Sequence, residues 1–166
     1  MFVALLSEGT AKRPRARQAS DTLGFDCGSS CLLASAPDYL RFAQMLLDGG
    51  QAGKARLLGS GSVALLTRDQ LQGRIENRIG LPGEVLQYGS SSQGYGFGVA
   101  VQTSHRQMVL PGEPGGFGVA APGGQYFWVD PASGLVTVLL ARTPDPDSAL
   151  RLQRQVQALV YQAFTD

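Results

Sequence analysis

Few residues in this chain have the types and spacing that catalysis requires. Ser104 precedes the single histidine, His105, but adjacent side chains of a strand point in opposite directions, which does not suit a nucleophile and its base. An exposed loop histidine is the simpler interpretation. Glu113 and Asp130 flank an apolar stretch and can be drawn as a carboxylate pair, although roles in turns and caps are more usual for such residues. The glycines within 116–121 match part of a dinucleotide-binding fingerprint, yet a strand pattern follows them instead of a helix.

Other catalytic and metal-binding signatures are missing from the sequence. A single histidine excludes an H-E-x-x-H zinc site, and neither a G-K-[ST] phosphate loop nor a G-x-S-x-G nucleophile elbow occurs. Cys27 and Cys31 form a C-x-x-x-C pair without the two further ligands that a structural zinc site needs. We interpret this pair as two free, buried thiols. A disulfide between them is the alternative interpretation. We therefore expect no metal and no cofactor.

The clearest structural element is a helix that begins near residue 35. Ser35 can cap this helix, Pro37 suits its first turn, and Asp38 stands where a capping-box carboxylate lies. Apolar residues then recur at helical spacing. Gly49 and Gly50 predict the end of the helix, because glycine readily adopts the left-handed backbone that terminates helices.

Two further helices are expected. A shorter helix starts near Ser60, and its apolar side extends to Leu71. A long helix near the carboxy terminus is capped by Asp147 or Ser148. Its apolar stripe consists of Leu152, Val156, Leu159, Val160 and Phe164. A single stripe of this kind indicates that the helix lies on one face of a sheet.

The remaining pattern is that of short strands. Residues 94–101 alternate apolar and small side chains, which predicts one half-buried strand. Shorter strands are expected over 117–121, 126–129 and 135–140, the last two joined as a hairpin by the turn residues 130–134. Helices precede and follow a run of antiparallel strands, so the predicted class is α+β, with an antiparallel sheet flanked by helices.

Composition limits the function classes further. The 166 residues suit one domain, in which residues 1–24 read as an irregular arm, 25–166 as the folded part and 72–93 as a long loop. The net charge of +1 argues against nucleic-acid binding, and no apolar run is long enough to span a membrane. The first six residues are too few for a secretory leader, so a cytoplasmic location is the default expectation.

Several segments resemble one enzyme family in their order and spacing. They include A-S-A-P-D-Y-L-R-F from residue 34, G-Y-G-F-G from residue 94 and Y-F-W-V-D-P from residue 126. Together they are similar to the carboxy-terminal part of β-lactamase-related serine hydrolases, the group of class C β-lactamases, family VIII esterases and D-alanyl-D-alanine peptidases. The resemblance covers residues 25–166. It implies the β-lactamase/transpeptidase-like fold and acyl transfer on a small-molecule ester, amide or β-lactam.

Two motifs of that family are absent here. Its nucleophile lies in S-x-x-K, where lysine helps to deprotonate serine. The only lysines of this chain are Lys12 and Lys54, and Gly9 and Gln51 stand three residues before them. No tyrosine has an asparagine two residues later, so the family's Y-x-N motif is also missing. The resemblance therefore implies a truncated chain that lacks the catalytic residues and is inactive alone.

The third motif of the family falls inside the chain. It is a K-T-G, H-T-G or W-G-G triplet on a strand that lines the cleft, and the next residue donates its N–H to the oxyanion hole. Alignment without gaps places the triplet on Val119, Ala120 and Ala121, and the donor position on Pro122. Proline has no N–H to donate. If the alignment slips by two residues, Gly124 takes the donor position.

Three interpretations follow from the resemblance. The first is an inactive carboxy-terminal fragment of a serine hydrolase, which exposes apolar surface and is prone to self-association. The second is an enzyme assembled in trans with a missing amino-terminal half that carries S-x-x-K and Y-x-N. The third is a non-catalytic module that binds a ligand or a protein on the same sheet.

Overall fold

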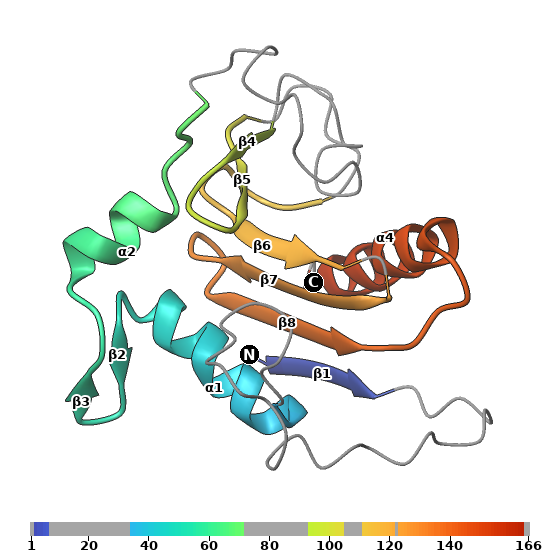
Figure 1. Ribbon diagram of the computed structural model, residues 1–166, viewed down its shortest axis with the longest axis horizontal. Helices are drawn as coiled ribbons and strands as arrows, with labels where there is room; N and C mark the ends of the chain where they lie inside the picture. The colour runs from blue at the N-terminus through green and yellow to red at the C-terminus, as the bar shows by residue number, and fades with distance from the viewer. Residues whose placement is uncertain (1, 7–33, 72–92, 105–110, 122, 165–166) are drawn as a thin grey trace, which may run out of the picture.

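The computed structural model describes residues 2–6, 34–71, 93–104, 111–121 and 123–164. Its centre is a six-stranded sheet with the strand order β1-β8-β7-β6-β5-β4 (Figure 1). In chain order these strands are β1 (Phe2–Leu6), β4 (Gln93–Tyr95), β5 (Ala100–Gln102), β6 (Phe117–Ala120), β7 (Gln125–Asp130) and β8 (Leu135–Leu140). Strands β4 to β8 pair antiparallel with their neighbours, whereas β1 joins β8 in parallel.

Helices cover both faces of this sheet, with α1 (Ala36–Leu47) on one side and α4 (Pro146–Gln162) on the other (Figure 1). Since side chains alternate along a strand, β7 and β8 contribute to both cores. The core on the α1 side contains Phe127, Val129, Val136 and Val138. The core on the α4 side contains Tyr126, Trp128, Leu135 and Leu139. The predicted α+β class, an antiparallel sheet flanked by helices, is confirmed.

Helix α1 is followed by small elements that extend from its end. These are a hairpin of β2 (Gln51–Ala52) and β3 (Ala55–Arg56), and the short helix α2 (Ser60–Leu66). Gly49 and Gly50 have φ angles of 61° and 95°, so the chain leaves α1 through the left-handed conformation that the glycine pair predicted.

The start of α1 is capped as its sequence indicates. Ser35 is the N-cap, and its Oγ accepts a hydrogen bond from the backbone N–H of Asp38 at 3.4 Å. The Ser35 hydroxyl in turn donates to the Asp38 carboxylate at 2.6 Å. The carboxylate therefore holds the capping side chain in place, and its negative charge lies near the positive end of the helix dipole.

Replacing Ser35 by alanine should lower the free energy of unfolding by about 1 kcal/mol, because the cap of α1 is lost. Chemical denaturation, followed by the fluorescence of the single tryptophan, measures the change. Ser62→Ala is the matched control, since Ser62 is an exposed residue inside α2 and alanine is the better helix former. Equal losses in the two variants would contradict the capping role.

The hairpin of β7 and β8 is the best-predicted part of the sheet. Its six-residue register runs from Gln125 opposite Leu140 to Asp130 opposite Leu135. Gly134, the last residue of the turn, has a φ angle of 62°, which glycine adopts without strain.

The amino-terminal segment departs from the expected irregular arm. Phe2–Leu6 forms β1 and pairs in register with Val136 to Leu140 of β8, while residues 7–24 lie outside the described part of the chain. An uninterrupted apolar segment is typical of a strand added in parallel to a sheet, and it shows no period-two alternation. That is why the segment escaped prediction as a strand.

The strand predicted over 94–101 is instead a hairpin. Tyr95 of β4 pairs with Ala100 of β5, and the N–H of Gly96 donates to the carbonyl of Val99 at 2.8 Å. Gly98 has a φ angle of 79°, which breaks the extended run. A side chain on Gly96 would collide with the backbone carbonyl of Leu66, so these glycines serve the turn and the close approach of α2.

The ends of two helices also differ from prediction. Helix α2 ends at Leu66, so Leu71 lies beyond it. The N-cap of α4 is Asp145, which precedes the predicted caps Asp147 and Ser148. Its carboxylate accepts a hydrogen bond from the backbone N–H of Ser148 at 2.8 Å. Pro146 then occupies the first turn, where a missing N–H costs nothing.

The buried face of α4 differs from its predicted apolar stripe. Val156 and Val160 are buried against the sheet, and Leu152 packs at the edge of the same core. Leu159 and Phe164 are 64% and 40% exposed, respectively. The face of α4 that packs on the sheet instead includes the buried residues Ala149, Gln153 and Gln157.

Candidate functional site

The positions predicted for the third motif lie at the free end of β6. Strand β5 pairs only with Phe117 and Gly118 of β6, whereas β7 continues alongside to pair with Val119 and Ala120. Within the described residues, the second half of β6 therefore has a ladder partner on one edge only. Such an edge leaves backbone groups accessible to an extended ligand.

Side chains at this end of β6 divide between the two faces of the sheet. Val119 lies opposite Phe127 in the register and packs at the core on the α1 side. Ala120 lies opposite Tyr126 and packs at the core on the α4 side. Val119 and Ala121 therefore point to the same face, which carries α1.

A cavity of about 550 Å³ opens on that face, and we call it the β6 cavity. Its lining residues are Ala34, Asp38, Tyr39, Phe42, Val119, Ala121, Gln125, Tyr126, Phe127 and Leu140. The volume is in the range of small-molecule sites. Two of the three predicted triplet positions, Val119 and Ala121, thus lie in one cavity, and Ala120 faces away from it.

Three aromatic rings form one wall of the β6 cavity. The ring of Tyr39 meets the ring of Phe127 edge-on, with centroids 5.4 Å apart. Phe42 lies 5.8 Å from Tyr39 and 6.5 Å from Phe127. Phe127 is 3% exposed, whereas Phe42 is 45% exposed at the mouth. The wall joins a fixed ring of the sheet to two rings of α1.

The charged group at the mouth of the β6 cavity is a carboxylate. The hydrogen bond from Ser35 holds the pKa of Asp38 below its usual range, and Arg41 beside it acts in the same direction. Arg41 forms an ion pair with Asp38 at 2.9 Å, and its side chain is 80% exposed. Burial raises the pKa of Tyr39, so its hydroxyl stays protonated. At neutral pH the Asp38 carboxylate at the cavity is therefore an anion, and the Tyr39 hydroxyl is neutral.

Backbone directions show which N–H groups face the free edge of β6. The N–H of Ala121 donates to the carbonyl of Gln125 at 2.8 Å, toward the β7 side. Because these directions alternate along a strand, the N–H and carbonyl of Ala120 point toward the opposite, free edge. The N–H of Gly124 donates to Ala121 at 3.0 Å and is therefore already engaged. This argues against Gly124 as the donor, while Pro122 lies outside the described residues.

Asp130 has a structural role. Its contact with Glu113, the other member of the suggested carboxylate pair, is made to the backbone N–H of Glu113. Asp130 is fully buried and accepts hydrogen bonds from the N–H groups of Ala132, Ser133 and Glu113 at 3.0, 3.2 and 3.3 Å. The hydroxyls of Ser133 and Tyr161 add bonds of 3.1 and 2.6 Å. The carboxylate thus ties the hairpin turn to α4 and to the segment that leads into β6.

None of the other sequence candidates that the structure describes lines the β6 cavity. Ser104 accepts a hydrogen bond at its carbonyl from Gln102, and His105, Cys27 and Cys31 lie outside the described residues. The glycine fingerprint over 116–121 contains β6 and is followed by β7, a strand as predicted. Among the residues that the structure describes, no cluster of three potential metal ligands occurs.

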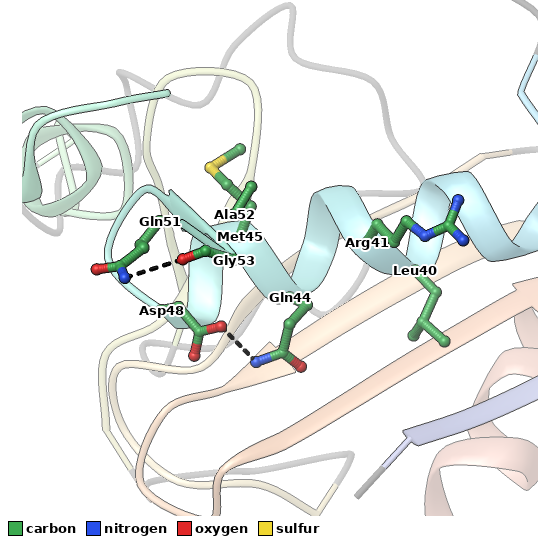
Figure 2. Close-up of a pocket in the computed structure, with 8 residues that line it drawn as sticks. All are labelled: Leu40, Arg41, Gln44, Met45, Asp48, Gln51, Ala52 and Gly53. Carbon is green, nitrogen blue, oxygen red and sulfur yellow. Dashed lines mark hydrogen bonds between the residues drawn. The ribbon is translucent and has the colours of Figure 1, made fainter. Parts of the chain in front are cut away.

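A second cavity, of about 370 Å³, lies between α1 and the β2 region (Figure 2). Gln44 donates to Asp48 along the end of α1 at 2.9 Å, and Gln51 donates to the carbonyl of Gly53 at 3.0 Å. No residue of β6 lines this cavity. Its side chains include an arginine, an aspartate and two glutamines, but no serine, cysteine or histidine that could act as a nucleophile or base.

Several lining residues of the β6 cavity were not singled out from the sequence. Tyr39 and Phe42 are three residues apart on α1 and therefore share a side of the helix. Two aromatic residues at this spacing are a signal of a packed or binding face. Their partners Phe127 and Val119 are more than 70 residues away in the chain, so the cavity itself had no local signature.

Comparison with known proteins assigns the family. The sequence model of the family described as Beta-lactamase matches residues 4–162. "Uncharacterized protein MT1414" and "Protein Rv1367c", from two strains of Mycobacterium tuberculosis, are each 31% identical to this chain over 120 residues. Those residues are 69% of this chain but only 28% of either relative.

Solved structures show the same fold. Unliganded simvastatin synthase (LovD) from Aspergillus terreus aligns with a TM-score of 0.55 at 19% identity, over 78% of this chain and 34% of that protein. Its selenomethionyl form aligns with a TM-score of 0.56 at 16% identity, over 79% and 34%. In the described part of this chain, no helix is long and apolar enough to cross a membrane. The match over nearly the whole chain shows that this protein belongs to the Beta-lactamase family.

Proposed function

We propose that this chain forms the carboxy-terminal wall of an acyl-transfer cleft in a β-lactamase-related serine hydrolase, and that it has no hydrolase activity alone. One observation carries the proposal. Val119 and Ala121, which the family resemblance places on the cleft strand, both line the β6 cavity beside the free end of β6. The substrate would be a small ester, amide or β-lactam.

The proposed lack of activity follows from the residues that the chain does not contain. It has neither S-x-x-K nor Y-x-N, so the family's nucleophile and its base are missing. Pro122 at the oxyanion position has no N–H, and loss of one such donor costs about 10²–10³ in rate in enzymes. The chain spans only 28% of its curated relatives, which is consistent with chemistry supplied by another part of the fold.

The isolated chain should hydrolyse p-nitrophenyl esters and a chromogenic cephalosporin no faster than buffer. A fluorophosphonate, which labels activated serines, should leave the mass of the protein unchanged. A full-length family member is the positive control for both measurements. Turnover that the fluorophosphonate abolishes would contradict the proposal, because it would require a nucleophilic serine within these 166 residues.

A non-catalytic binding module is the second candidate. The observation that favours it is the aliphatic Val119 in the β6 cavity, at a position where the family has lysine, histidine or tryptophan. The DNA upstream of the Met1 codon separates the two candidates. An S-x-x-K motif there, in frame or one frameshift away, supports a carboxy-terminal part of an enzyme. Its absence, together with ligand binding that forms no covalent adduct, supports the module.

Self-association is a further part of the proposal. Among the described residues, six large apolar side chains are exposed: Phe42, Leu57, Leu65, Phe97, Leu159 and Phe164. These residues come from α1, α2, α4 and the segments that join smaller elements. An assembly that covers part of this surface is the expected state at high concentration.

A further inference from the structure

The charge of the β6 cavity restricts what it can bind. Among the described residues that line it, Asp38 is the only one that carries a charge at neutral pH, and none is basic. Arg41, the nearest cation on α1, is paired with Asp38 and does not line the cavity. A ligand that enters the cavity therefore finds no positive partner among the residues that line it.

The polar atoms in the lining are largely committed to the protein. The hydroxyl of Tyr126 donates to Gln157, on the α4 side of the sheet, at 2.6 Å. The side-chain N–H groups of Gln125 donate to the carbonyls of Ala141 and Gly123 at 3.0 and 3.5 Å. A carboxylate in the cavity would therefore lose its water without gaining a donor from these two side chains, and the neutral Tyr39 hydroxyl is the remaining side-chain donor among the described lining residues.

The remaining surface suits an apolar group. The Tyr39, Phe42 and Phe127 rings form one wall, and Val119, Ala121 and Leu140 complete the lining with aliphatic groups. An uncharged aliphatic chain or aromatic ring fits within a cavity of this size and gains free energy from leaving water. Val119 lines the cavity from the part of β6 that β5 does not pair, opposite Phe127 in the register.

We infer that the β6 cavity is selective for uncharged apolar acyl groups and excludes carboxylates, with Val119 and Asp38 as the residues that set this selectivity. The inference rests on the proposed function and narrows it. The substrates would be esters or amides with an aliphatic or aromatic acyl group. β-Lactams and peptides that carry a free carboxylate at this position would be poor ligands.

Two probes of the same shape and different charge test the selectivity. Hexanamide is neutral and hexanoate is an anion at pH 8. Titration of the isotope-labelled chain with each probe, followed by backbone amide resonances, gives both the affinity and the location of binding. Hexanamide should shift the resonances of Val119 and Ala121, and hexanoate should bind at least tenfold more weakly.

Three variants assign the effect to residues. Val119→Lys should strengthen hexanoate binding at least tenfold, because an ammonium then lines the cavity. Asp38→Asn, at an exposed position that accommodates an amide of the same shape, should strengthen hexanoate binding severalfold relative to hexanamide binding. Leu65→Ala, which removes an exposed side chain of α2 outside the cavity, should change neither affinity.

The outcomes separate the selectivity from the proposed function. If the Val119 resonance reports equal affinity for both probes, and Asp38→Asn changes neither affinity, the selectivity is overturned. The cleft assignment stays intact in that case. A failure of both probes to shift Val119 and Ala121 would overturn the cavity as a ligand site, and the cleft assignment with it. Should Val119→Lys fail to fold, Asp38→Asn still decides the charge effect.

Discussion

Replacing Asp130 by alanine should lower the free energy of unfolding by about 3–5 kcal/mol. The carboxylate is fully buried and accepts five hydrogen bonds, from Ala132, Glu113, Tyr161 and both the N–H and hydroxyl of Ser133. Alanine would leave these donors without a charged acceptor. Denaturant titration followed by the fluorescence of Trp128, which is 6% exposed, measures the loss.

Two milder variants serve as controls for the Asp130 cluster. Ser133→Ala and Tyr161→Phe each remove one donor and keep the carboxylate, so each should cost about 1–2 kcal/mol. Burial, together with the Asp130 carboxylate, raises the pKa of Tyr161, so the hydroxyl remains a donor at neutral pH. A loss below 1 kcal/mol for Asp130→Ala would show that the cluster is not a main determinant of stability.

The Asp130 cluster also matters for the site. Through Tyr161 and the N–H of Glu113, it connects α4 to the segment that precedes β6. Gln157, one helical turn before Tyr161, donates to the carbonyl of Pro111 at 2.6 Å and holds the same segment. The position of β6 thus depends on polar contacts made from the α4 side of the sheet.

Replacing Phe127 by alanine should cost about 3–5 kcal/mol, the usual range for truncation of a buried aromatic residue. Phe127 is 3% exposed and packs between Tyr39 and Phe42 of α1 and the sheet. The same denaturant titration measures the change. The truncation would also remove the fixed ring of the β6 cavity, so hexanamide should no longer bind with the affinity of the unaltered chain.

Phe42→Ala is the matched control for the aromatic wall. This residue is 45% exposed, so its truncation should cost well under the loss at Phe127 while still removing one ring from the cavity. Similar losses of stability at the two positions would contradict the different burial of the two rings. Unchanged hexanamide binding in both variants would contradict the aromatic wall as part of the site.

Much of the fold was predictable because its signals are local. Ser35 and Gly49 mark the ends of α1 through backbone preferences of single residues. The β7–β8 hairpin follows from an apolar run on each side of a turn-forming segment. The prediction of one strand over 94–101 was wrong for a related reason. Its glycines fit the alternation of a strand, but they serve a turn where β4 folds back on β5.

The sequence by itself determined the family resemblance and the α+β class, and it predicted a cleft strand at Val119, Ala120 and Ala121. Each of these depends on residue order along a short stretch. Only the tertiary structure decided what lies around those residues. The aromatic wall joins Tyr39 and Phe42 of α1 to Phe127 of β7, and the ladder of β5 stops at Gly118. Such contacts depend on packing between segments far apart in the chain, for which local residue patterns carry no signal.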